Sequence, residues 1–177
     1  MKRIIILLCF VPLLVFGQET DFSKMAGYID LDELTKLFNS EAVTEVEIQN
    51  PLLSMAADMM EEEDPKVSSM LKTLQLIKVY TFENTVDQIK DIKAYIEELD
   101  GKLSSRKWNR FVKVRDENET TYVYLKNDGK KVKGLTVLSV DNDESTFVNI
   151  VGDIDLKNIS SLGGQFNIPK MDSIQTR

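Results

Sequence analysis

Four strand-like segments in a row, joined by short polar turns, constrain the fold of this chain more than any other feature. No helix-like segment interrupts them, and the turns are rich in Asp, Asn, Glu and Gly, which favour tight chain reversals. Successive strands joined in this way pair antiparallel, so the sequence predicts a meander in the second half of the chain. The four segments are residues 108–115, 121–126, 132–140 and 145–151.

The first half of the chain alternates helix-like and strand-like patterns. Residues 43–49 alternate as in a strand with one exposed face, and residues 76–82 are apolar on both faces, as in an inner strand. Asn-Pro and Asp-Pro pairs begin helix-like segments at residues 50–60 and 65–74, and a long amphipathic helix follows at residues 84–101. This order predicts an α+β fold, a mostly antiparallel sheet with amphipathic helices packed on one face.

Several finer expectations follow from the same patterns. We expect short helices after Asp30 and after Asp155, and a stop of the long helix at Gly101. Apolar residues on the second face of the sheet predict a cover, either the N-terminal helix or a second copy of the protein. The predicted contact between the long helix and the sheet joins Val86, Ile89, Ile96 and Leu99 to Val79, Val112, Val123, Val137 and Ile150.

The N-terminus has the pattern of a secretory signal peptide. Lys2 and Arg3 precede an apolar stretch of about 13 residues, too short for a membrane span of about 20. We therefore expect a signal peptide at residues 1–18, one domain at 19–162 and an irregular tail at 163–177. Because Cys9 lies inside the apolar stretch and not after it, we expect an exported protein of the periplasm or the exterior, without lipid anchor or transmembrane segment.

The composition excludes several classes of function. The chain has no histidine and one cysteine, which removes the side chains that build most zinc sites and Ser-His-Asp triads. The formal net charge of −7 disfavours nucleic acid as a partner. The sequence therefore predicts no cofactor, no metal site and no nucleic-acid binding, and it does not identify a small-molecule ligand.

Two hydrolytic alternatives remain open at this point. Ser69 and Lys72 fit the Ser-x-x-Lys pattern of penicillin-binding proteins, although the other motifs of those enzymes are absent. A pair of carboxylates such as Asp153 and Asp155 could hydrolyse glycosides without His or Cys, but two acids beside a bend are explained as well by helix capping.

A basic segment and a methionine-bearing helix are the candidate partner sites. Residues 18–100 carry 19 acidic and 7 basic side chains, whereas residues 101–134 carry 10 basic and 4 acidic ones. Strict alternation places Arg110 on the opposite face from Lys113 and Arg115, so we expect a diffuse positive rim that steers an acidic partner or the acidic region of a second copy. The alternatives without a binding role are that the lysines are only solvated and that the methionines belong to an adaptable core. The candidate residues are Lys130, Lys131, Lys133, Lys113, Arg115, Met55 and Met59.

The chain resembles the DUF4252 family over residues 21–162. The resemblance rests on the leader, on Pro51-Leu-Leu-Ser-Met55, on Leu76-Ile-Lys-Val-Tyr80, and above all on the closing Phe147-Val-Asn-Ile-Val-Gly-Asp-Ile-Asp-Leu156. It implies an exported protein of Bacteroidota and brings no catalytic residues with it. The preferred interpretation is therefore a non-enzymatic cell-envelope module that binds a protein partner or itself, with a small hydrolase as the alternative.

Overall fold

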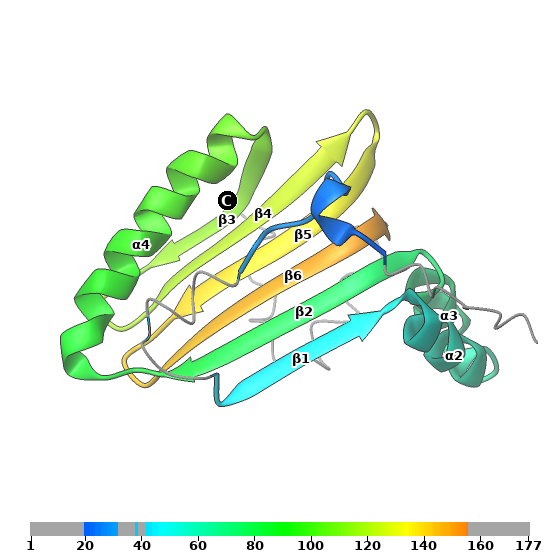
Figure 1. The fold of residues 1–177 in the computed structure, drawn as a ribbon, viewed down its shortest axis with the longest axis horizontal. Helices are drawn as coiled ribbons and strands as arrows, with labels where there is room; N and C mark the ends of the chain where they lie inside the picture. The colour runs from blue at the N-terminus through cyan, green and yellow to red at the C-terminus, as the bar shows by residue number, and fades with distance from the viewer. Residues whose placement is uncertain (1–19, 32–37, 39–41, 156–177) are drawn as a thin grey trace, which may run out of the picture.

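The computed structural model describes residues 20–31, 38 and 42–155. Within them, one antiparallel sheet of six strands has the order β1-β2-β6-β5-β4-β3 (Figure 1). The α+β class and the antiparallel sheet predicted from the sequence are confirmed. The expected helices after Asp30 and Asp155 and the irregular tail fall largely or wholly outside the described residues. The elements are η1 (Phe22–Lys24), β1 (Thr44–Gln49), α2 (Asn50–Met60), α3 (Pro65–Leu71), β2 (Leu74–Glu83), α4 (Val86–Ser105), β3 (Trp108–Arg115), β4 (Thr120–Asp128), β5 (Lys131–Val140) and β6 (Glu144–Ile154).

The meander and the inner strand follow the sequence prediction. Strands β3, β4, β5 and β6 are consecutive neighbours, and every pair in the sheet is antiparallel. Strand β2 lies between β1 and β6 and contributes side chains to a buried cluster on each face of the sheet, so both of its faces are apolar. The Asp141 carboxylate accepts the amides of Asp143 and Glu144, so the polar turn before β6 is closed by its own side chain.

Helix α4 covers one face of the sheet, which we call the aromatic face. Its buried residues Ile92, Ile96, Leu99 and Leu103 share a cluster with aromatic strand residues. The prediction placed α4 on the opposite face and is wrong in this respect. Large aromatic side chains bridge the distance between a sheet and a helix, whereas the smaller predicted partners all point the other way. The strand residues of the aromatic face are Tyr80, Phe82, Trp108, Tyr122, Tyr124, Leu138, Val140 and Phe147.

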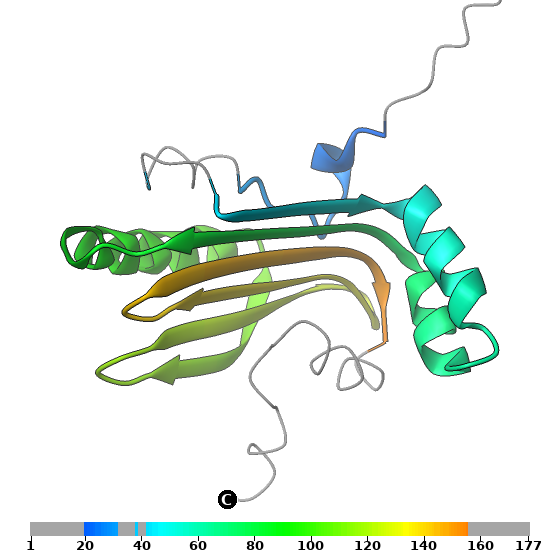
Figure 2. The same ribbon diagram turned by 90° about the horizontal axis from the view of Figure 1, so that it is seen from below.

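The second face carries mainly aliphatic side chains, and we call it the valine face. The residues predicted to contact α4 belong here, and Leu53 of α2 and Leu71 of α3 join the same cluster. Figure 2 shows α2 and α3 packed at one end of the sheet. The strand residues of this face are Ile48, Ile77, Val79, Val112, Val123, Leu125, Val132, Leu135, Val137, Val148, Ile150 and Ile154.

A buried asparagine holds the N-terminal segment on the aromatic face. The Asn149 side chain accepts the Ile29 amide and donates to the Gly27 carbonyl, both at 3.0 Å. Gly27 lies so close to Gly134 that a Cβ on Gly134 would come within 2.4 Å of the Gly27 Cα. The described N-terminal residues therefore lie on the same face as α4. The expectation that an N-terminal helix covers the other face is not met by this part of the chain.

The helix ends show where local signals were sufficient and where packing overrode them. The Asp64 carboxylate caps α3 by accepting the amides of Lys66 and Val67, as an Asp-Pro start predicts. Thr85 and Gln88 form a capping box at the start of α4. Helix α4 does not stop at Gly101, because Leu103, in its last turn, is buried in the core.

Candidate binding surfaces

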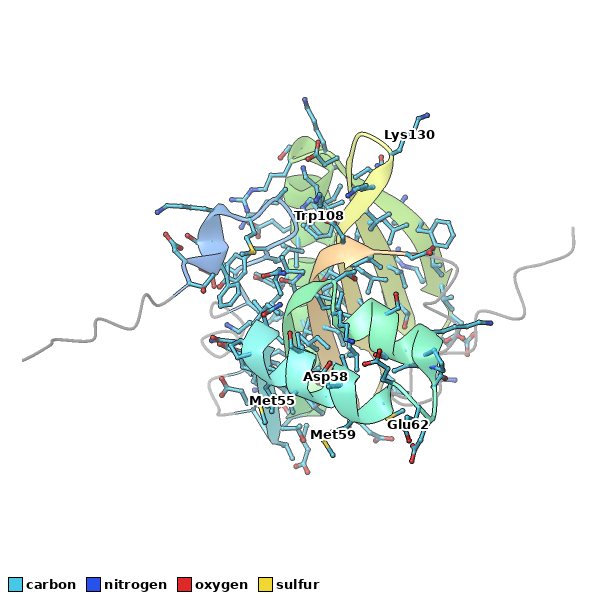
Figure 3. All side chains as sticks on the ribbon, turned by 90° about the vertical axis from the view of Figure 1, so that its right-hand side faces the viewer. Met55, Asp58, Met59, Glu62, Trp108 and Lys130 are labelled. Atoms are coloured by element: carbon cyan, nitrogen blue, oxygen red, sulfur yellow. The ribbon has the colours of Figure 1, made fainter. Side chains whose placement is uncertain are left out.

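Helix α2 exposes a row of large apolar side chains, the α2 stripe, which consists of Leu52, Met55 and Met59. Their exposed fractions are 56%, 64% and 81%. The spacing of three and four residues places them on one side of the helix, while Leu53 and Ala57 are the residues that face the protein. In Figure 3 the labelled Met55 and Met59 lie on the outer surface of α2. Two of the sequence-predicted candidates thus belong to a surface and not to a core.

Acidic side chains border the α2 stripe. Asp58 and Glu62 lie along the outer part of α2 and the turn that follows (Figure 3). The Lys72 ammonium ion pairs with Glu61 at 3.0 Å and with Asp58 at 3.2 Å. Glu62 and Glu63 are exposed beside this triad, so the border keeps a negative charge.

The same triad argues against the Ser69/Lys72 pair as a nucleophile and its base. A lysine must lose its proton to act as a general base. The hydrogen bonds from Lys72 to Glu61 and then to Asp58 raise the pKa of its ammonium group, which is the wrong direction. Lys72 therefore serves as an ion-pair partner of α2.

The hairpin lysines are largely engaged within the molecule. Lys131 donates to the Asp153 carboxylate at 2.8 Å, and Lys133 donates to the other oxygen of the same carboxylate. These hydrogen bonds, the one from Lys131 first, lower the pKa of Asp153. Lys130 is exposed at the turn and borders a shallow cavity of about 510 Å³ with Thr73 and Asp155. Of the three predicted lysines, two thus fix β5 to β6.

A β-bulge gathers the cations of β3 on one face, against the sequence prediction. The pairing with β4 shifts between Arg110 and Val112, so Arg110 falls on the aromatic face together with Lys113 and Arg115. The guanidinium of Arg110 and the ammonium of Lys113 lie 5.6 and 5.4 Å from the centre of the Tyr122 ring. Arg115 donates to the Tyr122 hydroxyl at 2.8 Å. Strict alternation failed because the bulge inserts one extra residue.

Acids on α4 neutralise part of this cluster. Arg110 donates to Asp100 at 2.6 Å, and Arg115 forms an ion pair with Glu97. Asp100 also accepts the Tyr124 hydroxyl at 2.7 Å. Burial and the bond to Asp100 raise the pKa of Tyr124 well above its ordinary value, so this phenol stays protonated. The cluster therefore joins α4 to the edge of the sheet.

Lys78 forms a buried site that the sequence did not predict. The side chain is 9% exposed, and its ammonium lies 3.4 Å from the Glu47 carboxylate and 5.6 Å from the centre of the Tyr80 ring. A cavity of about 340 Å³ opens beside it, lined also by Asp21 and Tyr28. The signal in the sequence was a lysine within an apolar inner strand, but only the register between β1 and β2 shows that Glu47 stands opposite.

The family of the chain follows from a comparison with family models. A model described as "Domain of unknown function (DUF4252)" matches residues 38–162. The chain belongs to the DUF4252 family. No curated protein and no solved structure matches it significantly. The matched range contains every described strand and α2 to α4, so the DUF4252 region comprises the whole sheet.

Metal sites and membrane-spanning helices are both absent from the described part of this DUF4252 chain. Residues 20–31, 38 and 42–155 contain no group of three or more Asp, Glu, Cys or His side chains placed to hold a metal ion. In the same residues, no helix is long and apolar enough to cross a membrane. Asp153 is occupied by two lysines, and Asp155 is exposed beyond the end of β6.

Proposed function

We propose that this chain is an exported, non-enzymatic binding module whose α2 stripe docks on a protein with an apolar surface bordered by cationic side chains. The observation that carries the proposal is the exposure of Leu52, Met55 and Met59 on one side of α2. A cluster of large apolar side chains at the surface is a feature of interaction sites. Methionine side chains adapt to the shape of a partner, which suits them to such a surface.

The charge around the stripe supports a cationic partner. Glu62 and Glu63 are exposed, and Asp58 and Glu61 share a single lysine. Opposite potentials steer association and disfavour partners of like charge. Anionic membranes and nucleic acids are therefore poor candidates for this surface. A protein with lysine or arginine around an apolar patch fits both the shape and the charge.

The first test is the double variant Met55→Glu and Met59→Glu. Two added carboxylates remove apolar contact area and would lose their hydration against the proposed partner's apolar patch, which costs more than attraction to the cationic border returns. We therefore expect at least a tenfold loss of binding, equal to about 1.4 kcal/mol. The protein is captured from the native envelope after chemical cross-linking, and the partners are identified by mass spectrometry. Both methionines are exposed, so the melting temperature should stay within a few degrees of that of the parent.

A matched control keeps this test specific. Val43 is 62% exposed and precedes β1, at the opposite end of that strand from α2, so Val43→Glu introduces the same group elsewhere. A partner that binds the parent and Val43→Glu, but not the α2 variant, and that weakens with added salt, supports the proposal. Equal capture by all three proteins would contradict it.

Export is the second part of the proposal, and the leader supports it. Lys2 and Arg3, the apolar stretch and Gly17 form the three parts of a secretory signal. We expect intact-mass measurement of the exported protein to show a chain cut near Gly17 or Gln18, without an acyl group. The mass of the uncut chain, or an added lipid, would contradict this prediction.

A further inference from the structure

The sheet ends in two outer edges of opposite character. In the described part of the chain, β1 and β3 are the outermost strands, and no described strand pairs with their outer sides. Exposed edges are templates for pairing with another chain. We infer that the edges of β1 and β3 are the two halves of one contact between copies of this protein, which continues the antiparallel sheet from one copy into the next.

The direction of the strands permits this contact. Each of the five neighbouring pairs in the sheet is antiparallel, so β1 and β3, at the two ends of a six-strand order, run in opposite directions (Figure 1). A second copy placed beside the first in the same orientation therefore presents its β1 antiparallel to β3. Its aromatic face stays level with the aromatic face of the first copy, so no inversion is needed.

A single register matches both faces at once. On the aromatic face, Glu45 and Glu47 of β1 stand opposite Tyr80 and Lys78, and Lys113 and Arg115 of β3 stand opposite Tyr122 and Thr120. Val46 and Ile48 of β1 lie on the valine face, and so do Val112 and Val114 of β3. Antiparallel pairing of residues 45–48 with residues 112–115 gives the pairs Glu45 with Arg115, Val46 with Val114, Glu47 with Lys113, and Ile48 with Val112.

The four pairs are favourable in chemistry as well as in position. Two pairs join opposite charges and two join β-branched aliphatic side chains, which are the cross-strand combinations that stabilise sheets. Val114 is 41% exposed at the outer edge, and pairing with a second copy would remove this apolar surface from water. The side chain of Arg115 is also partly exposed despite its contact with Glu97, and Lys113 is exposed.

The charges also exclude the symmetric alternatives. Pairing β1 with β1 would bring Glu45 and Glu47 against the same acids, and pairing β3 with β3 would bring Lys113 and Arg115 against the same cations. Like charges placed opposite each other destabilise a strand pair. The contact is therefore heterologous, and each copy keeps one free edge, so association continues from copy to copy. The bulge at Arg110 ends the regular part of β3, so each contact is short and weak.

Disulfide cross-linking between two single-cysteine chains tests the register directly. Cys9 is the only cysteine, so the full chain is prepared with Cys9→Ser, and Val46→Cys and Val114→Cys are introduced into separate, differently tagged proteins. Opposite residues of an antiparallel pair have Cα atoms about 4.5–5.5 Å apart, within the range that a disulfide spans. We expect mild oxidation to give a mixed disulfide dimer as the main covalent product.

The matched control shifts the register by two residues on the same face. Val46→Cys mixed with Val112→Cys places the two Cα atoms on a diagonal of about 7–8 Å, which a disulfide does not bridge without backbone movement. A dimer in the first mixture, with at least tenfold less in the second, supports the inference. Equal yields from the two mixtures, no dimer above background, or a preference for homodimers of the Val46→Cys protein overturns the inference. The sulfhydryl is close in size to the replaced valine methyl groups, so folding is retained.

Sedimentation of the protein without cysteines gives an independent measurement. We expect the average mass to rise with protein concentration, and Lys113→Glu to weaken association about tenfold, because it replaces an attractive pair with a repulsive one. Lys90→Glu makes the same change of charge at an exposed position of α4, outside both edge strands, and should leave association unchanged. A monomer at every concentration overturns the inference. None of these measurements involves α2, so their failure is distinct from failure of the proposed function.

Discussion

Replacing Ile96 with aspartate is expected to abolish stable folding. The Ile96 side chain is fully buried between α4 and the aromatic face, within the cluster that includes Phe82 and Tyr124. A carboxylate at this position has no described cation within the cluster, and an unpaired buried charge costs more than about 4 kcal/mol. Because domains are stable by only about 5–15 kcal/mol, most of the stability is lost. Urea unfolding followed by circular dichroism measures the change.

Ile89→Asp is the matched control for this prediction. Ile89 lies on the same helix two turns earlier, is partly exposed, and is absent from the cluster of buried residues. Its new carboxylate reaches solvent, so we expect a loss of about 1 kcal/mol. Similar losses for both variants would show that α4 packs through a different side from the one described here.

The position of α4 shows how far sequence patterns reach in this fold. The helix, the strands and the order of the meander could be predicted, because periodicity shows which apolar residues share one face of an element. Strand β2 alternates Tyr80 and Phe82 on one face with Ile77 and Val79 on the other, so both faces are apolar. Periodicity then cannot tell which face meets the helix. The two faces differ in the size of their side chains. Only the structure shows that α4 packs on the face with the larger, aromatic ones.

The same ambiguity left the orientation of α2 open in the sequence. Met55 and Met59 could belong either to an exposed partner site or to an adaptable core, and the structure shows that Leu53 and Ala57 face the protein instead. This helix is apolar around most of its circumference, so its periodicity does not single out one buried side. Packing at one end of the sheet selects the buried side, and the remaining apolar side becomes the surface on which the proposed function rests.

Two features of the basic segment could not be predicted from the sequence. On β3, the bulge after Arg110 inserts one residue, and no signal in the local sequence marks it. At the hairpin, the sequence placed the lysines correctly near the turn, but Asp153, 20 residues and more away, holds Lys131 and Lys133. Long-range ion pairs depend on register, so a local charge count overstates the charge available to a partner.

Replacing Asn149 with leucine is expected to release the N-terminal segment from the sheet. Leucine has the same branching and the same number of side-chain heavy atoms as asparagine, but it leaves the Ile29 amide and the Gly27 carbonyl without the partners that Asn149 supplies. Each buried polar group left without a hydrogen bond costs about 1–3 kcal/mol, so the sum is about 2–6 kcal/mol. We expect a large loss of stability and, in protein that still folds, fast hydrogen exchange at the Ile29 amide.

The exchange measurement separates this role of Asn149 from a general weakening of the core. Asn109→Leu is the control, because Asn109 lies in an exposed position of β3 and the same substitution there leaves the Ile29 and Gly27 contacts intact. If Asn149 is the anchor, protection at Ile29 falls more than protection in the centre of β5 and β6, because the segment opens locally before the sheet unfolds. Equal loss of protection at all these amides would show that the segment and the sheet unfold as one unit. In that case Asn149 would contribute to the whole domain and not to the attachment of the segment.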